Sequence, residues 1–162
     1  MKDWPYPRIF AHRGGGSLAP ENTLAAIRVG QSFGYAAHEF DVKLSGDGVA
    51  LLLHDATLER TTTGNGRAAD FPWSELAKLD AGAWHSEAFR GERIPTFAEA
   101  AALLRSKGTM ANVEIKPTPG LSAETGRAVA LEAAKHWAGA SRAPLLSSFS
   151  FDALMAAKDA AP

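Results

Sequence analysis

Short apolar runs alternate with amphipathic stretches along the chain. The apolar runs have the length of β-strands and lie at residues 8–12, 36–43, 49–53, 110–116 and 143–149. Helical periodicity follows Asn22 or Thr23, either of which suits an N-cap, and recurs at residues 97–107, 124–137 and 151–160. Such alternation is typical of parallel βα units rather than of hairpins. The pattern therefore predicts an α/β fold with a parallel sheet.

The fourth strand is preceded by a helix with clear end signals and by a long connection. Thr96 and Glu99 have the spacing of a capping box, and Gly108 follows where the helix should stop. Residues 56–95 form a polar connection with one expected short helix at residues 74–79. Long ordered connections often shape a binding site, so we expect this one to border the functional residues.

The composition indicates one soluble globular domain over residues 1–162, with 46% hydrophobic and 22% charged residues. A formal net charge of −1 gives no basic field for nucleic acid. The absence of cysteine leaves carboxylate and imidazole as the charged metal ligands, which favours a hard cation. Residues 1–5 lack a signal pattern, and no apolar run approaches the roughly 18 residues of a membrane span. We therefore expect a cytoplasmic protein without membrane insertion.

Three carboxylates lie on two of the expected strands. Side chains two apart on a strand point to the same face. Glu39 and Asp41 therefore share one face of their strand, and Glu114 and Lys116 share one face of theirs. If the two strands are neighbours, the three carboxylates could surround Mg²⁺ or Ca²⁺, which prefer oxygen ligands. The alternative is that Glu39 and Asp41 pair with Lys43 or other bases at a solvated strand end, and the spacing alone does not decide between these readings.

Two histidines follow apolar runs at His12 and His54. Imidazole titrates near neutral pH, so this pair suits the proton transfers of phosphodiester cleavage. The alternative for each is a structural histidine bonded to a strand-end carbonyl. We expect only structural roles for His38, His85 and His136.

Positive charge accompanies the candidate acids at Arg13 and Lys116. A guanidinium can hold two phosphate oxygens at once, although either residue could be a structural counter-ion. Residues 14–17 offer backbone N–H groups but match no phosphate-loop or dinucleotide fingerprint, so alone they are a weak phosphate cradle.

Read in order, six short motifs resemble those of the glycerophosphodiester phosphodiesterase family. They are His12-Arg13-Gly14, Pro20-Glu21-Asn22-Thr23, Glu39-Phe40-Asp41-Val42, Leu53-His54-Asp55, Leu58-Glu59-Arg60-Thr61-Thr62 and Val113-Glu114-Ile115-Lys116. The likeness runs from about Ile9 to the end of the chain. It implies a (β/α)₈ TIM barrel with its site at the carboxyl ends of the strands.

The resemblance also implies roles for the residues at the motif positions. These are an acid and base pair, His12 and His54; ligands of a divalent cation, Glu39, Asp41 and Glu114; and phosphate contacts, Arg13 and Lys116. The implied reaction is hydrolysis of a small glycerophosphodiester to glycerol 3-phosphate and an alcohol. Related barrels that cleave phosphoinositides pass through a cyclic phosphate, and the same route is expected here.

The chain is short for such a barrel, which typically needs about 250 residues. We expect a barrel that stops after about five βα units, with its C-terminal part absent. An open parallel sheet exposes an edge, which favours pairing with another chain as a homo-oligomer. The truncation leaves one alternative to a glycerophosphodiester phosphodiesterase, a non-enzymatic partial barrel that acts as an assembly or interaction unit. A second alternative is a phosphoinositide or sphingolipid phosphodiesterase of the same superfamily.

Overall fold

The structure, a computed structural model, describes residues 4–162. The expectation that residues 1–5 carry no signal pattern falls partly on residues 1–3, which lie outside the described residues. The sheet has four strands in the order β2-β1-β3-β4. Their bounds are β1 Ala37–Leu44, β2 Ala50–Leu52, β3 Met110–Ile115 and β4 Leu145–Ser147. Within the described range no helix is both long and apolar enough to cross a bilayer.

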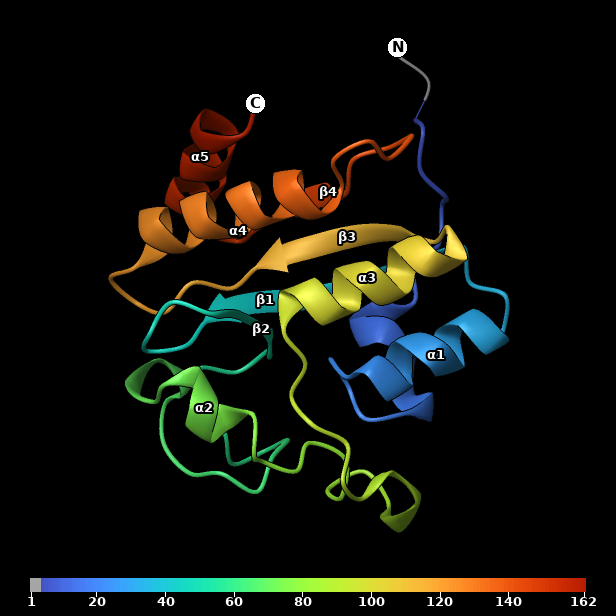
Figure 1. The fold of residues 1–162 in the computed structure, drawn as a ribbon, viewed down its shortest axis with the longest axis vertical. Coiled ribbons are helices and arrows are strands. Elements are labelled where there is room, and N and C mark those ends of the chain that lie inside the picture. Colours follow the sequence, from blue (N-terminus) through green and yellow to red (C-terminus); the bar gives the residue numbers. More distant parts are fainter. Residues whose placement is uncertain (1–3) are drawn as a thin grey trace.

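Helices cover one face of this sheet. They are α1 Leu24–Ser32, α3 Phe97–Lys107, α4 Ser122–His136 and α5 Phe151–Ala160, and each packs on the next in that order, while the short α2 Trp73–Leu76 belongs to the long connection (Figure 1). The capping box is present, because the Thr96 and Glu99 side chains bond to each other's backbone N–H, and Gly108 closes α3 with a left-handed backbone. The predicted helices at residues 97–107 and 151–160 are confirmed residue for residue.

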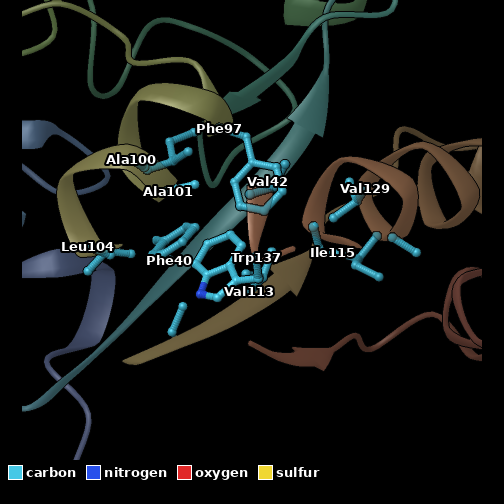
Figure 2. Close-up of a cluster of buried hydrophobic side chains, with 14 of the residues drawn as sticks. Phe40, Val42, Phe97, Ala100, Ala101, Leu104, Val113, Ile115, Val129 and Trp137 are labelled. Carbon is cyan, nitrogen blue, oxygen red and sulfur yellow. The ribbon is translucent and has the colours of Figure 1, made fainter. Parts of the chain in front are cut away.

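The core lies between the helices and the sheet. Phe40 of β1 and Val113 of β3 are fully buried there, against Phe97 of α3 and Trp137 at the end of α4 (Figure 2). On a strand, alternate side chains face opposite sides, so burial of Phe40 turns its neighbours Glu39 and Asp41 to the other face of the sheet. Core packing therefore decides which face carries the acidic residues.

The direction predicted for residues 49–53 is wrong. β2 runs antiparallel to β1, with Val42 opposite Leu52 and Leu44 opposite Ala50. The turn between them holds only residues 45–49, closed by a hydrogen bond from Ser45 N–H to the Val49 carbonyl. A parallel crossover needs a dozen residues or more, so this connection permits only a hairpin.

The strand predicted at residues 8–12 is also wrong, so the described sheet has four strands rather than five. Only Ala11 pairs, in a parallel bridge with His38, and residues 12–14 form a short 3₁₀ turn. Ile9 is 69% exposed, so its side chain is not packed into the sheet. Arg13 then takes a left-handed backbone, φ 51°, which turns the chain away immediately after His12.

Close packing of α1 against the turn at residues 12–14 depends on Gly30. A Cβ at this position would lie 2.4 Å from the Gly14 carbonyl oxygen and 2.7 Å from Cε1 of His38. In an open helix, Ala would stabilise by about 1 kcal/mol relative to Gly. We expect Gly30→Ala instead to lower the free energy of unfolding by about 1–3 kcal/mol, measured by urea denaturation.

Arg28→Ala, at an exposed position on the same helix, is the control and should change stability by less than about 0.5 kcal/mol. If Gly30→Ala were more stable than wild type, this would contradict the close approach of Gly30 to Gly14 and His38.

Candidate active site

The three predicted carboxylates converge on the open face of the sheet. Glu39 and Asp41 point to the same side of β1, and the parallel register places Asp41 opposite Glu114 of β3. One carboxylate oxygen from each residue lies within 4.8 Å of the others. The Asp41 side chain is only 2% exposed. Three carboxylates this close form a group that could hold one metal ion.

Burial makes this acidic trio (Glu39, Asp41 and Glu114) costly without a cation. Burial, followed by the charges of Asp41 and Glu114, raises the pKa of Glu39 to about 7, against the partial effect of a hydrogen bond from the Arg13 N–H. Oε1 of Glu114 is buried and accepts no well-directed hydrogen bond, although Nζ of Lys116 lies 2.8 Å away. All-oxygen donors of this charge fit a hard divalent cation such as Mg²⁺ or Ca²⁺.

The raised pKa predicts a pH effect on stability in the absence of divalent ions. The unfolded chain loses the Glu39 proton near pH 4.5, whereas the folded chain keeps it until about pH 7. Ionised Glu39 therefore destabilises the fold increasingly as the pH rises from 4.5 through 7. We expect Glu39→Gln to become progressively more stable relative to wild type across this window, measured by urea unfolding in chelator.

Comparing the two proteins isolates Glu39, because all other groups titrate in both. Saturating divalent ion should stabilise wild type more than the variant. If the difference in stability between wild type and Glu39→Gln did not change with pH, this would contradict the raised pKa of Glu39.

Asp41 is fixed by Asn22 and by two bases. Nδ2 of Asn22 donates to Oδ2 of Asp41 at 2.8 Å, and the Asp41 backbone N–H donates to Oδ1 of Asn22 at 3.0 Å. Nε of Arg13 lies 3.8 Å from Asp41 Oδ2, and Nζ of Lys116 lies 3.7 Å from Oδ1. The cap of α1 is Thr23, whose hydroxyl accepts from the Ala26 N–H, so Asn22 is left to serve the site.

The alternative in which Lys43 or other bases pair with the strand carboxylates is met in part, because Arg13 and Lys116 lie within 4 Å of Asp41, whereas Lys43 does not take this position. Nζ of Lys43 donates to the Asp55 carbonyl, and no ion pair in residues 4–162 joins it to Glu39 or Asp41. Arg13 and Lys116 lie beside the trio instead. The Arg13 backbone N–H donates to Glu39 Oε2 at 2.9 Å. Both bases thus lie where a phosphate at the trio would need positive charge.

The two candidate histidines have different surroundings: His12 lies beside Glu39, whereas His54 directly follows Leu53, whose backbone N–H donates to the Asp41 carbonyl. His12 is 69% exposed at its side chain, and its Nε2 lies 3.9 Å from Glu39 Oε2. His54 has Nδ1 at 2.7 Å from Oδ1 of Asp55. An ionised carboxylate can only accept a hydrogen bond, so Nδ1 of His54 carries the proton. Nε2 is then the ring nitrogen left to exchange a proton with a substrate. Across the described chain, neither imidazole has a hydrogen bond to a strand-end carbonyl, which was the structural alternative.

The sequence profile of the glycerophosphoryl diester phosphodiesterase family matches residues 12–162. The chain belongs to this family. The resemblance carried by the six motifs is therefore confirmed. A glycerophosphodiester phosphodiesterase of Caldanaerobacter subterraneus is 44% identical over 108 residues, and human glycerophosphodiester phosphodiesterase 1 is 46% identical over 102.

Solved structures of this family share the fold. An Oleispira antarctica phosphodiesterase, solved in complex with the product sn-glycerol-3-phosphate, superposes with a TM-score of 0.89 at 41% identity. A glycerophosphodiester phosphodiesterase of Agrobacterium tumefaciens gives 0.81 at 32%. The matches cover 95% and 92% of this chain but only 62% and 61% of those chains. The predicted α/β class, a TIM barrel present in part, is thus confirmed.

The chain also spans less than half of these curated relatives. The match covers 67% of this chain and 44% of the Caldanaerobacter protein, and 60% of this chain and 31% of the human protein. Activity and substrates of a whole family member are accordingly proposals for this chain.

The remaining histidines of this family member have structural partners. Burial lowers the pKa of His38, whose Nδ1 lies 2.8 Å from the Gly14 carbonyl oxygen, and His136 bonds to Glu132 on the same helix. His85 also has a structural partner. Its Nε2 lies 3.1 Å from the Ser17 carbonyl oxygen, and it lines a cavity of about 320 Å³ that His12 and Arg13 also line.

The contacts of three charged residues that connect the site were not predicted from the sequence. Glu21 accepts from the guanidinium of Arg13 and from both terminal nitrogens of Arg60, and Nε of Arg60 donates to Asp55. All three lie inside the family motifs, so the motifs were the available signal. The partnership of Glu21 and Arg60, which are 39 positions apart, has no local signature.

Proposed function

We propose that this chain carries the catalytic face of a glycerophosphodiester phosphodiesterase. The reaction is hydrolysis of a small glycerophosphodiester, such as glycerophosphocholine or glycerophosphoethanolamine, to glycerol 3-phosphate and an alcohol. The observation that carries the proposal is the acidic trio on two adjacent strands, with His12 beside Glu39 and the bonded pair of His54 and Asp55 just after the neighbouring strand β2. Family membership supports it, as does the glycerol 3-phosphate bound to the Oleispira relative.

Each charged group has a defined task in this proposal. Glu39, Asp41 and Glu114 hold a divalent cation, Mg²⁺ or Ca²⁺, which when bound would offset the charge that builds up on the phosphoryl oxygens. Arg13 and Lys116 orient the phosphate from opposite sides of Asp41, since one lies near each of its oxygens.

The histidines move the protons. His12 takes the proton from a neighbouring glycerol hydroxyl as its oxygen attacks phosphorus, and His54 donates a proton from Nε2 to the departing alcohol oxygen as the P–O bond breaks. A water molecule then opens the cyclic phosphate with the two roles reversed. Asp55 suits His54 to the acid role, because its carboxylate accepts from Nδ1 and so leaves Nε2 as the nitrogen that transfers the proton.

The direct test is turnover of glycerophosphocholine by the purified chain. We expect release of glycerol 3-phosphate, detected by a coupled dehydrogenase assay, in Mg²⁺ or Ca²⁺ and none in chelator. Activity should return when the cation is added back. Turnover that persists in chelator would refute the metal-dependent reaction, and absence of turnover under every condition would refute the hydrolase for this chain.

One observation favours the assembly unit as a second candidate. β4 is an edge strand of the described sheet, and Phe149 and Phe151, which follow it, are 94% and 74% exposed. An exposed edge with apolar neighbours favours pairing with another chain. This candidate predicts self-association without turnover, so the mass of the chain in solution should be measured beside the assay.

A further inference from the structure

Arg60 connects Glu21 with Asp55, and has no hydrogen bond or ion pair with the acidic trio or with His12. Its two terminal nitrogens donate to the two oxygens of Glu21 at 2.8 and 2.7 Å, and its Nε donates to Oδ2 of Asp55 at 2.5 Å. Glu21 precedes α1, whereas Asp55 follows β2. One guanidinium therefore joins two segments that the sheet does not connect.

The geometry is specific to arginine. The two parallel bonds to Glu21 use the planar fork of the guanidinium, and the third bond uses Nε on the same group. A lysine has one charged atom and cannot reproduce this arrangement. The Glu21 side chain is 13% exposed and Asp55 30%, so both carboxylates are partly withdrawn from competing water.

Each carboxylate that Arg60 holds orients one residue of the proposed site. The other oxygen of Asp55 fixes Nδ1 of His54 at 2.7 Å. Glu21 also accepts from Arg13 at 2.8 Å, and the backbone N–H of Arg13 donates to Glu39. Hydrogen bonds thus link His54 to Arg13 through Asp55, Arg60 and Glu21, and the backbone of Arg13 links onward to Glu39 of the trio.

The ionisation of Asp55 agrees with these hydrogen bonds. Hydrogen bonding from Arg60, and then from His54, holds the pKa of Asp55 well below its usual range despite partial burial. Isolated surface ion pairs contribute little, but three directed bonds on one guanidinium form a network. A network of this kind restrains both of its carboxylates.

We propose that Arg60 is a positioning residue, which fixes the ring orientation and tautomer of His54 through Asp55 and the direction of Arg13 through Glu21. Its effect on turnover rests on the proposed function, whereas its effect on His54 does not. Groups that orient acting residues in this way typically change activity about 10–100-fold when removed.

The test that needs no activity is the tautomer of His54, read from ¹H–¹⁵N correlation spectra at a pH well above the ordinary imidazole pKa of about 6.5. In wild type we expect the Nδ1–H form. In Arg60→Gln, Asp55 is released, and His54 should shift toward the Nε2–H form that free histidine prefers. Arg90→Gln is the matched control, because Arg90 makes a similar two-bond pair with Glu87 elsewhere.

The kinetic test uses glycerophosphocholine. Arg60→Gln should lower kcat about 10–100-fold through His54 and also raise KM, because Arg13, which orients the phosphate, loses a restraint at the same time. Arg60→Lys should recover little of this loss. Millimolar methylguanidinium should partly restore Arg60→Ala, a result that a loss of overall stability would not give.

Wild-type tautomer and wild-type kcat in Arg60→Gln would overturn the proposal. If wild type has no turnover, the proposed function fails and the tautomer comparison still decides the role of Arg60. If Arg60→Gln does not fold, Arg60→Lys tests the same link, because lysine cannot make the three bonds, and an unchanged His54 signal there would overturn it.

Discussion

Turnover of glycerophosphocholine is expected to fall about 10²–10⁴-fold in His12→Ala, the range typical of a positioned general base. His12 lies beside Glu39 with its imidazole largely exposed, so the substitution should leave the fold intact. The measurement is kcat/KM at saturating Mg²⁺ or Ca²⁺, with unfolding curves recorded on the same samples.

His136→Gln is the control for this comparison. His136 bonds to Glu132 on α4, away from the trio, so its loss should leave kcat/KM unchanged. Wild-type turnover by His12→Ala would refute the assignment of His12.

The second large effect is expected for Asp41→Asn. Asp41 is the most buried of the three acids, and its loss removes a charge from the centre of the trio, between Arg13 and Lys116. Divalent affinity in oxygen sites depends strongly on the number of charged ligands, so we expect binding to weaken by at least about 100-fold and turnover to fall with it. Calorimetric titration with Ca²⁺ or Mn²⁺ measures the first effect.

The exposed Asp159→Asn on α5 provides the matched loss of one charge outside the site. It should bind the ion as wild type does. Equal loss in both variants, or in neither, would contradict a site centred on Asp41.

The parts of the fold that the sequence predicts well depend on neighbouring residues. The capping box of α3 involves positions three apart, and Glu39 and Asp41 share a face because of strand pleating alone. The direction of β2 was also local information, because the turn at residues 45–49 is too short for a crossover. That prediction was wrong because a regular alternation of strands and helices was given more weight than the turn length.

Contacts between distant segments could not be derived in the same way. The position of Asp41 opposite Glu114 depends on the register of two strands whose paired residues are 73 positions apart, which no local pattern fixes. The bonds of Arg60 depend on how the long connection folds back over the start of α1. The family motifs indicated which residues matter, but their contacts came only from the fold.

The central claim is that the trio and both imidazoles converge on one ion. Substoichiometric Mn²⁺ tests it through paramagnetic broadening of the histidine ring signals. The control is His136, the last residue of α4, which follows β3 in the chain (Figure 1); the 15 residues of this helix place His136 roughly 20 Å from its first residue. We predict that His12 and His54 broaden together at the first additions while His136 stays sharper. Broadening of only one of the two, or of all three equally, would contradict the claim.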